Sequence, residues 1–453
     1  MNVLSLYRHM FMVPDLRRKI FFTLGVIAVY RFGTAIPTPG VDPAAVETLN
    51  QIQSDGGFLA LLNLFSGGAL DQLSVFALGI MPYITASIIL QLLAVVIPKL
   101  QALQEEGQSG QKIITQWTRY VTIVLAIIQS VGMITTIGGP GGLARGSANP
   151  PPELLDLTLV PDRSAGVLAL MVLTMTAGTA FIMWLGELIT EKGVGNGMSI
   201  IIFASILSQL PSQFSRLWAQ TVLVQRYLPF VILMIVFVGM IVAIIYMDQA
   251  QRRIPIQFAK RVRGRKVLGG HSTYIPLKVN TAGVIPVIFA SSFLMFPALI
   301  AVVLPGDGRF QTWFRDLVNN HLGGGAMGTG AISWWYVIAM FLLVVFFTYF
   351  YTSIQFDPVR QAEMVQRQGG FIPGFRPGHQ TEAHLSHILS RITLPGSLFL
   401  ATIATLPALV SLGWGLNMSF AGVSILIVVG VALETMKQIE SQLTMRNYEG
   451  ILS

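Results

Sequence analysis

The stretch FLALLNLFSGGALDQLS, residues 58–74, is apolar enough to enter a bilayer but too short to cross one. As a helix, its apolar part from Phe58 to Phe65 would be about 12 Å long, against roughly 30 Å of hydrocarbon. Gly67 and Gly68 then interrupt the helix, and Asp71 follows. The stretch therefore predicts a half-length apolar helix that enters between two membrane spans without being a span itself.

The composition of the whole chain is that of a membrane protein. Of 453 residues, 53% are hydrophobic and only 11% are charged, which is less than half the charge of an ordinary soluble domain. The chain has no cysteine, and this excludes disulfides, thiolate nucleophiles and Cys-ligated metals. Arg17, Arg18 and Lys19 precede the first apolar run, but no small-residue cleavage site closes that run. We interpret it as an uncleaved first span.

Ten apolar runs of helical length follow one another along the chain. They cover 20–36, 77–97, 120–137, 165–185, 194–210, 228–247, 282–304, 332–354, 393–410 and 418–433. A long basic loop after the fifth run predicts two halves of five spans, and an odd number of crossings requires the second half to be inverted. The predicted fold is an all-α membrane protein with ten transmembrane helices in two inverted five-helix halves and a pathway between them.

The basic residues predict the orientation of these spans. On the side of the N-terminus lie 22 of the 29 Lys and Arg residues, and basic loops stay in the cytosol. Both termini are therefore predicted to be cytosolic, and Arg31, near the outer end of the first span, is predicted to snorkel. The predicted parts are a cytosolic N-terminal segment 1–19, an N-terminal half 20–210, an outer loop 211–228, a C-terminal half 229–436 with cytosolic loops 248–280 and 355–391, and a cytosolic tail 437–453.

Motifs for nucleotide or metal binding are weak. Residues 323–328 fit GxGxxG, but they lie in an outer loop with no preceding strand, which favours a flexible loop. The sequence has neither GxxxxGKS nor GxxxxGKT for ATP. His379, His384 and His387 lie close together in a cytosolic loop without HExxH spacing or a fourth ligand, so a metal site is the weaker interpretation. The sequence predicts no cofactor and no metal.

Groups for catalysis are equally weak. Glu187 and Glu191 have an i, i+4 spacing that could pair two carboxylates, but they fall at a cytosolic span end beside Lys192, where a solvated helix terminus is favoured. The sequence has no GxSxG elbow, and no histidine lies inside a predicted span. The protein is predicted not to be an enzyme.

The predicted spans carry almost no charge, although a transporter needs charge near the midplane to hold ions or substrates. Apart from Arg31, only Asp71 and Glu434 come close to the membrane interior. The spans instead contain amides and hydroxyls, at Gln91, Gln129, Ser291 and Ser292, with Asn280 at the mouth of the seventh span. This favours a wide uncharged path or a lipid-facing seam. A small-molecule secondary transporter with inverted repeats remains the alternative.

The loop 248–280 contains eight basic residues. Alternating IPIQFA and STYIPLKV flank the basic turn KRVRGRK, which predicts a hairpin that extends into the cytosol. A positive-inside loop is ordinarily basic, but this many basic residues on an ordered projection favour the docking of something anionic, such as ribosomal RNA phosphates or an acidic protein face. The segment PGFRPGHQT, residues 373–381, predicts a second tight cytosolic loop, which presents Arg376.

Five segments of the sequence resemble the SecY family, the channel subunits of bacterial Sec protein translocases. They are LNLFSGGAL, FALGIMPYITASIILQLL, TEKGVGNGMSIIIFASI, LKVNTAGVIPVIFASS and FRPGHQT. The resemblance runs in order over roughly residues 15–448. Two positions depart from the family pattern: His379, where the family usually has an acidic or basic residue, and Met198, where a ring isoleucine is common. The first leaves the chemistry of its loop open, and the second leaves the shape of the ring open.

The resemblance implies a role for the short apolar helix. It would be a plug, at about 58–72, that packs into the outer funnel of a central pore between the two halves, with a glycine turn that water can reach. The plug residues are Phe58, Leu62, Phe65, Gly67 and Gly68. Below the plug, a ring of apolar side chains would disfavour water and ions yet yield to a passing polypeptide. The ring residues are Ile80, Ile84, Met198, Ile202, Ile288 and Ile427. Without the family, they would be ordinary core residues.

Two further sites are implied by the resemblance. Gln91, Gln129 and Asn280 match the lateral gate, where spans two and three meet spans seven and eight, and amides bonded across such a seam contribute only about 0.5 to 2 kcal/mol each. A seam held so weakly can open to lipid. Arg265, Lys266 and Arg376 would form the surface on which cytosolic partners dock.

The predicted function is that of a passive protein-conducting channel. It would translocate unfolded secretory chains, selected by their signal sequences, and release hydrophobic segments of nascent chains sideways into the lipid bilayer. The resemblance implies SecE and SecG as partner subunits, and the SecA ATPase or a translating ribosome as the source of energy. It implies the bacterial plasma (inner) membrane as the location. The thylakoid membrane, and a working unit of one copy or two, are alternatives that the sequence leaves open.

Overall fold

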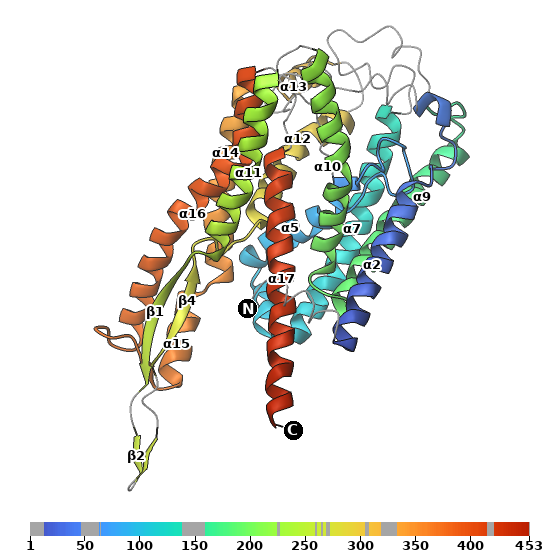
Figure 1. Cartoon of the computed structure of the whole chain (residues 1–453). Helices are drawn as coiled ribbons and strands as arrows, with labels where there is room; N and C mark the ends of the chain where they lie inside the picture. Colours follow the sequence, from blue (N-terminus) through green and yellow to red (C-terminus); the bar gives the residue numbers. More distant parts are fainter. Residues whose placement is uncertain are drawn as a thin grey trace.

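The structure is a computed structural model, and it describes residues 13–46, 63, 65–137, 159–223, 227–258, 261–263, 266–268, 272–303, 308–318, 333–414 and 421–452. These residues form a bundle of long helices, from one end of which a β-hairpin projects (Figure 1). The helices are α2 (Pro14–Thr34), α5 (Met81–Val96), α6 (Pro98–Glu105), α7 (Gln108–Ile137), α9 (Ala165–Lys192), α10 (Gly197–Leu223), α11 (Tyr227–Gln249), α12 (Ile285–Val303), α13 (Arg309–Leu317), α14 (Trp334–Gln355), α15 (Pro358–Arg367), α16 (His379–Trp414) and α17 (Ala421–Leu452).

Each of the ten predicted spans overlaps one long helix of the described chain. In order, these helices are α2, α5, α7, α9, α10, α11, α12, α14, α16 and α17. Seven described helices are long and apolar enough to cross a membrane by themselves, and the bent pair of α5 and α6 would be an eighth. The stretch Ile285–Leu294 in α12 is apolar but shorter. In α2, the three basic residues 17–19 lie inside the helix and lower its hydropathy.

Local sequence explains where several of these helices bend or end. α5 and α6 meet at 106°, and the break is Ile97, which is extended because the residue before a proline avoids the helical region. α10 continues through Pro211 to Leu223, so residues 211–223 of the predicted outer loop are helical. Beside this proline, the Ser212 hydroxyl donates to the Gln209 carbonyl at 2.8 Å. The predicted cytosolic loop 355–391 is likewise mostly helical, because α15 and the first turns of α16 lie in it, and the predicted tail continues α17.

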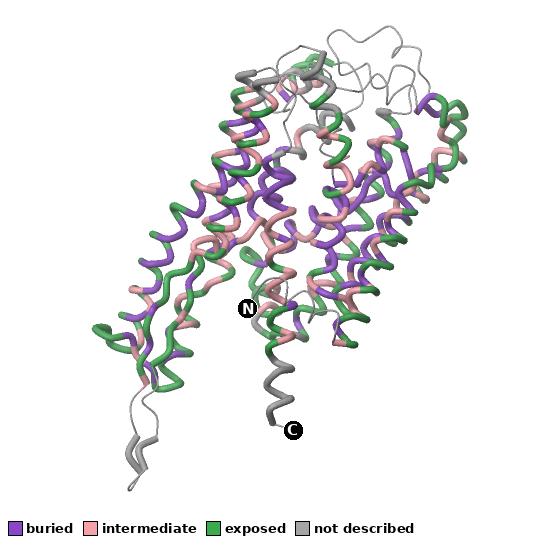
Figure 2. Tube along the Cα trace, in the orientation of Figure 1, coloured by how far each residue is buried: buried purple, intermediate pink, exposed green. Residues whose placement is uncertain are grey.

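The outward faces of the bundle carry large apolar side chains. Ile235 of α11 is 66% exposed, Leu173 of α9 is 67% exposed and Leu342 of α14 is 61% exposed. Facing water would be unfavourable by about 25 cal/mol per Å² of such surface, so these faces are suited to lipid. Figure 2 shows that buried and exposed residues alternate along the helices, whereas the hairpin outside the bundle is largely exposed.

One apolar cluster connects the two halves of the chain. From the first half it takes buried residues of α2, α5, α9 and α10, and from the second half buried residues of α11, α12, α14, α16 and α17. A smaller cluster lies in the first half, between the segment after the plug, α7 and α9. The centre of the fold is therefore where the halves meet, as expected for a pathway between them.

The predicted hairpin is confirmed, and it is part of a small sheet. β1 (Gln251–Phe258) pairs antiparallel with β4 (Ser272–Lys278), while β2 (Arg261–Arg263) pairs with β3 (Lys266–Leu268) farther along the same projection. β1 also pairs on its other edge with β5 (Gly370–Phe371). The predicted cytosolic loops 248–280 and 355–391 are therefore joined in one sheet. The alternating side chains Ile254 and Leu277 are buried against α15 and α16. This packing attaches the small sheet to the helices.

The start of α2 and the end of α17 lie at the hairpin end of the bundle. Leu16, Val194 and Ile439 form a small apolar cluster there, and Lys19 Nζ donates to Gln442 Oε1 at 3.4 Å. Lys437 of α17 forms an ion pair with Asp248, just before β1. Both described chain ends are therefore on the side of the hairpin, as an even number of crossings requires.

Candidate functional site

The described part of the predicted plug is a tight turn closed by its own polar groups. Phe58 and Leu62 lie outside the described residues, whereas Phe65 is 1% exposed. The Ser66 hydroxyl donates to the Asn63 carbonyl at 3.1 Å and accepts from the Leu70 N–H at 3.2 Å. The Gly68 N–H also donates to the Asn63 carbonyl, at 3.1 Å. These bonds satisfy the backbone where the helix stops.

Side chains from α2 and α10 hold this turn, and we call Tyr30, Arg31 and Ser205 the plug seat. The Tyr30 hydroxyl donates to the Ser66 carbonyl at 3.0 Å and lies 2.7 Å from Ser205 Oγ. Arg31 Nη1 donates to the Gly67 carbonyl at 2.6 Å. Tyr30 and Ser66 are fully buried, so leaving these groups unpaired would cost free energy. The plug turn is therefore bonded directly to α2, and through Tyr30 it is linked to α10.

Gly67 is required for this close approach. Its φ is +69°, and a Cβ there would lie 3.0 Å from Arg31 Nη1 and 3.1 Å from Ser205 Cα. A side chain would be strained by the backbone and would also push the seat apart. The prediction that water reaches the glycine turn holds for part of it, because Gly67 is buried by the seat whereas Gly68 and Asp71 are partly exposed.

The sequence did not predict the plug seat. It placed Arg31 at the membrane surface by snorkelling, whereas its guanidinium bonds to the plug backbone. One signal for the seat was available: Arg31 lies in a predicted span, and no acidic residue lies near it in the sequence to pair with it. Tyr30 and Ser205 gave no signal, because a single tyrosine or serine in an apolar helix has no diagnostic spacing.

The six predicted ring residues all belong to the central apolar cluster, together with Phe65 of the plug. Each is at most 9% exposed, and they come from four elements: the start of α5, α10, α12 and α17. The set is Ile80, Ile84, Met198, Ile202, Ile288 and Ile427. The thioether of Met198 packs against Gly186 of α9, where a Cβ would overlap it, so this member also fills the contact between two helices of the first half.

The predicted gate lies where α12 packs against α7 and α5. The three amides do not form the expected mutual bonds in the described structure: Gln91 Nε2 donates to Ser87 Oγ of its own helix at 3.2 Å. Asn280 Oδ1 and Ser292 Oγ are buried with no hydrogen-bond partner among the described residues. Ser291 is satisfied by the Ile288 carbonyl at 2.9 Å. Two buried oxygens thus lack a partner in α12 and in the segment just before it.

The predicted docking residues lie on the projection and on the loop before α16. Arg265 is outside the described residues, and only the backbone of Lys266, in β3, is described. Arg376 is exposed in the loop that follows β5. On the same sheet, the Arg253 guanidinium lies 4.8 Å above the ring of Tyr274, a cation–π contact between β1 and β4.

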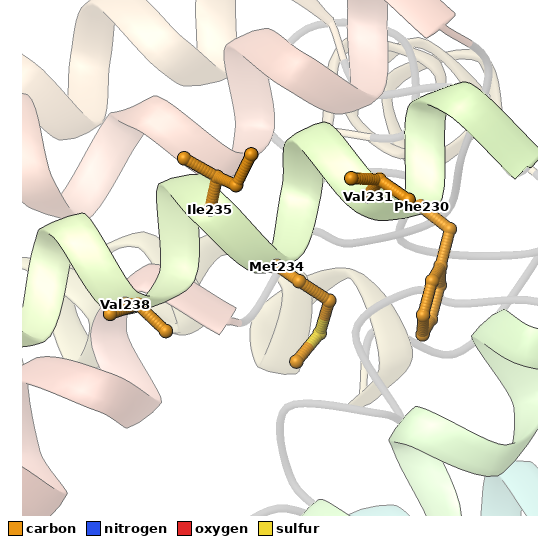
Figure 3. A pocket seen from close by; sticks show the side chains of 5 residues that line it. All are labelled: Phe230, Val231, Met234, Ile235 and Val238. Atoms are coloured by element: carbon orange, nitrogen blue, oxygen red, sulfur yellow. The ribbon is translucent and has the colours of Figure 1, made fainter.

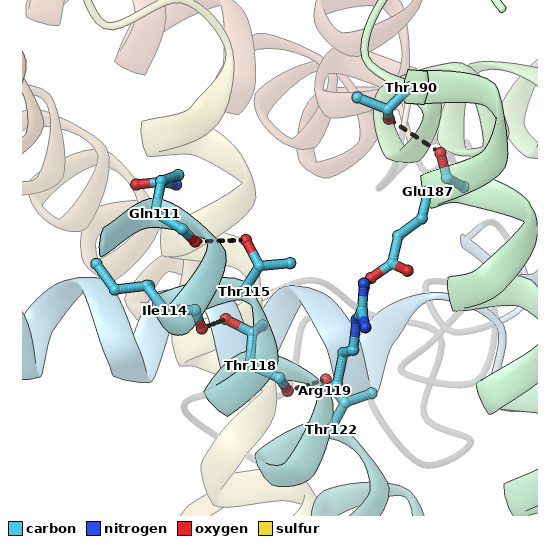
Figure 4. Close-up of polar contacts among 9 residues, drawn as sticks. Gln111, Ile114, Thr115, Thr118, Arg119, Thr122, Glu187 and Thr190 are labelled. Carbon is cyan, nitrogen blue, oxygen red and sulfur yellow. Dashed lines mark hydrogen bonds and ion pairs between the residues drawn. The ribbon is translucent and has the colours of Figure 1, made fainter. Parts of the chain in front are cut away.

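Glu187 does not pair with another carboxylate. Arg119 Nε of α7 lies 2.6 Å from Glu187 Oε1 of α9, and both side chains are partly exposed. Figure 4 shows this ion pair between the two helices, beside threonine hydroxyls that bond to carbonyls within their own helix. An exposed pair of this kind contributes about 0.2 to 1 kcal/mol, so it adds little to stability.

No metal cluster is found among the described residues, and the pocket along α11 is apolar. A groove along α11 is lined by apolar side chains that point outward from one helix, as Figure 3 shows. They are Phe230, Val231, Met234, Ile235 and Val238. The part of the chain that the structure describes contains no group of three metal-ligating side chains, and the ring of His384 is instead stacked on Phe375.

Comparison with known proteins places these features in context. The model of the SecY family matches residues 74–436. The protein translocase subunit SecY of Streptomyces scabiei is 50% identical over 455 residues, covering 99% of this chain and 100% of that protein. "The structure of a protein conducting channel" matches with a TM-score of 0.62 at 18% identity, covering 94% of this chain and 92% of that one. "Sec61 in the Canine ribosome-channel complex from the endoplasmic reticulum" matches with a TM-score of 0.58 at 17% identity, with the same coverage. Because the sequence identities are this low, the likeness of this chain to the two structures is one of fold alone.

Proposed function

This chain belongs to the SecY family, and from that premise we propose how its parts act in a protein-conducting channel. The chain is a multi-pass membrane protein, and its family is one of translocation channels. The predicted ring would form the constriction, the segment 58–72 would stop it from the outer side, and the seam at α12 would open it to lipid.

The observation that carries this proposal is the shared cluster of ring and plug. The six ring residues and Phe65 are buried together at the meeting of the two halves. A narrow collar without charge or hydrogen-bonding groups disfavours water and ions. Branched and flexible apolar side chains can still separate around a polypeptide, because they make no directional bonds that must be broken.

The seam at α12 supports sideways release. Leaving a buried oxygen without a partner costs about 1 to 3 kcal/mol, and two such oxygens lie in this region: Ser292 Oγ in α12 and Asn280 Oδ1 in the segment before it. The closed seam is therefore less stable than a fully bonded one. An apolar client segment that enters between α12 and α7 would face lipid on one side, which suits membrane insertion.

The alternative, a small-molecule secondary transporter, is not favoured. Such a carrier needs charged or polar groups near the midplane, whereas the centre of the described bundle is an apolar cluster. The groove on α11 is likewise apolar and faces outward.

We further propose the partners and location that the sequence predicted. SecE and SecG would pack on the lipid-facing helices. SecA or a translating ribosome would supply energy from the cytosolic side, where the basic hairpin and Arg376 would lie. The chain would then lie in the bacterial plasma membrane with both termini in the cytosol. Signal sequences would enter at the seam.

Conductance measurements on the purified protein in planar bilayers test the channel function. Deleting residues 60–70 should produce large, poorly selective ionic currents, whereas the unaltered chain should stay nearly closed. The matched control is deletion of residues 441–451 at the end of α17, which should leave the closed state unchanged. A deletion variant that folds and remains silent would contradict a plugged pore.

A further inference from the structure

The loop before α16 holds Arg376 by both of its backbone polar groups. The Arg376 N–H donates to Gln380 Oε1 at 3.3 Å, and the Thr381 hydroxyl donates to the Arg376 carbonyl at 3.0 Å. Both partners lie in the first turn of α16. The guanidinium itself is exposed. An exposed arginine therefore stands on a backbone that side chains have fixed.

The residue before Arg376 is held by the same helix. The ring of Phe375 is stacked on the imidazole of His384, with ring centres 3.8 Å apart and an interplanar angle of 25°. Gln380 and His384 are four residues apart, and so lie on one face of α16. Thr381 is 1% exposed, so its hydroxyl has no access to water as an alternative partner. Three side chains thus hold two consecutive residues.

The other end of the loop is fixed as well. Ile372 is 3% exposed and packs in one apolar cluster with Leu385 and Ile388 of α16. The Phe375 N–H donates to the Ile372 carbonyl at 3.1 Å, and β5 pairs with β1 just before the loop. The loop is consequently anchored on both sides, although it lies on the surface.

We propose that Gln380, Thr381 and His384 are positioning residues, a socket that fixes the backbone from which the Arg376 side chain reaches acidic groups of a SecA-type partner protein. This inference rests on the proposed docking role of Arg376. A long side chain on a mobile loop would have to be ordered when the partner binds, and that ordering reduces affinity. The socket orders the backbone before the partner arrives.

Thr381→Val tests the socket, because valine keeps the shape of the buried side chain and removes the hydroxyl. Hydrogen–deuterium exchange at residues 374–376 should become several-fold faster. Thr381→Ser restores the hydroxyl and should restore slow exchange. Thr402→Val is the matched control: its hydroxyl also bonds to a backbone carbonyl in α16, that of Leu398 at 2.7 Å, but it lies far along the helix from the loop.

Transport driven by purified SecA provides the second readout. The SecA concentration for half-maximal transport should rise several-fold in Thr381→Val, while the rate at saturating SecA stays unchanged, and Thr381→Ser should return both to normal. Unchanged exchange in Thr381→Val would overturn the socket. The charge reversal Arg376→Glu separates the docking role of Arg376 from the socket. If Arg376→Glu impairs transport and Thr381→Val does not, the socket inference is wrong. If neither variant affects transport, the docking role of Arg376 itself is wrong.

Discussion

At the scale of single residues, the polar groups of the predicted plug and those of the predicted gate differ in their hydrogen bonding. At the predicted plug, Tyr30 and Arg31 donate to carbonyls of the turn, and the Tyr30 hydroxyl also lies 2.7 Å from Ser205 Oγ. At the gate, Asn280 Oδ1 and Ser292 Oγ are buried and have no partner among the described residues. We therefore expect the bonded turn to stay in place in the resting state and the predicted gate to part more easily.

The plug seat yields the first prediction. Tyr30→Phe removes the donor to the Ser66 carbonyl, a bond that contributes about 0.5 to 1.5 kcal/mol. The plug should then leave its seat about 2- to 10-fold more often, and single-channel recordings should show brief openings at that higher frequency. Arg31→Met should act in the same direction. Tyr246→Phe, a change at a tyrosine that is 78% exposed on α11, should have no effect. Equal opening frequencies in Tyr30→Phe and Tyr246→Phe would remove the seat from the gating mechanism.

The gate yields the second prediction. Asn280→Leu replaces a buried, unpaired amide oxygen with an apolar group, which should stabilise the closed seam by about 1 kcal/mol or more. Signal sequences should then need higher hydrophobicity for export, measured with a graded series of signals on one reporter. The control Thr281→Val changes the adjacent residue, whose hydroxyl already donates to the Lys278 carbonyl at 2.8 Å, and should leave the threshold unchanged. A lower threshold in Asn280→Leu would reverse our assignment.

At the scale of elements, the existence of each helix was easier to predict from the sequence than its ends or its contacts with other elements. Apolar runs of helical length identify spans because a bilayer imposes length and hydropathy together. The end of α5 at Pro98 and the hairpin β1–β4 also follow from local sequence. β5 does not, because two residues carry no periodic pattern. The plug seat joins positions 175 residues apart through hydroxyls, and no local pattern reports such a contact.

Ring and plug should seal the pore jointly, which is the third prediction. Ile84→Asn combined with Ile288→Asn gives the collar hydrogen-bonding groups, so it should wet, but the plug should limit the ion leak to a modest level. Deleting residues 60–70 in that background should raise the conductance above the sum of the two separate effects. Ile182→Asn in α9 is the matched control, since Ile182 is fully buried in the same cluster but is not a predicted ring residue. It should lower stability without a leak. Conductances that merely add would show that these isoleucines only pack helices.

At the scale of the whole molecule, the two halves are joined by one apolar cluster, and both described chain ends lie beside the hairpin. The number of spans and the positive-inside rule predicted this arrangement from sequence. Which helices meet at the seam could not be predicted from the residues alone, because lipid-facing and partner-facing apolar side chains have the same composition. Family resemblance supplied that step.

The orientation of the whole molecule yields the fourth prediction. Because the chain has no cysteine, Thr273→Cys in β4 and Thr312→Cys in α13 each introduce a single reactive thiol. Both threonines are exposed. A membrane-impermeant maleimide added to intact spheroplasts should label the second variant at once and the first only after permeabilisation. Immediate labelling of Thr273→Cys would place the hairpin outside the cell and invert the proposed topology.

The pairing of β5 with β1 has a mechanical consequence. β1 and β4 are clamped to α15 and α16 through Ile254 and Leu277, and the Val279 N–H donates to the Ala250 carbonyl at 2.9 Å where the hairpin returns to the bundle. The hairpin, about 23 Å long as judged from β4 as a strand, is therefore held at its base. From that base the backbone runs through residues 279–284 into α12, the helix of the predicted gate. We expect a partner bound to the hairpin to act on α12 through this direct backbone link.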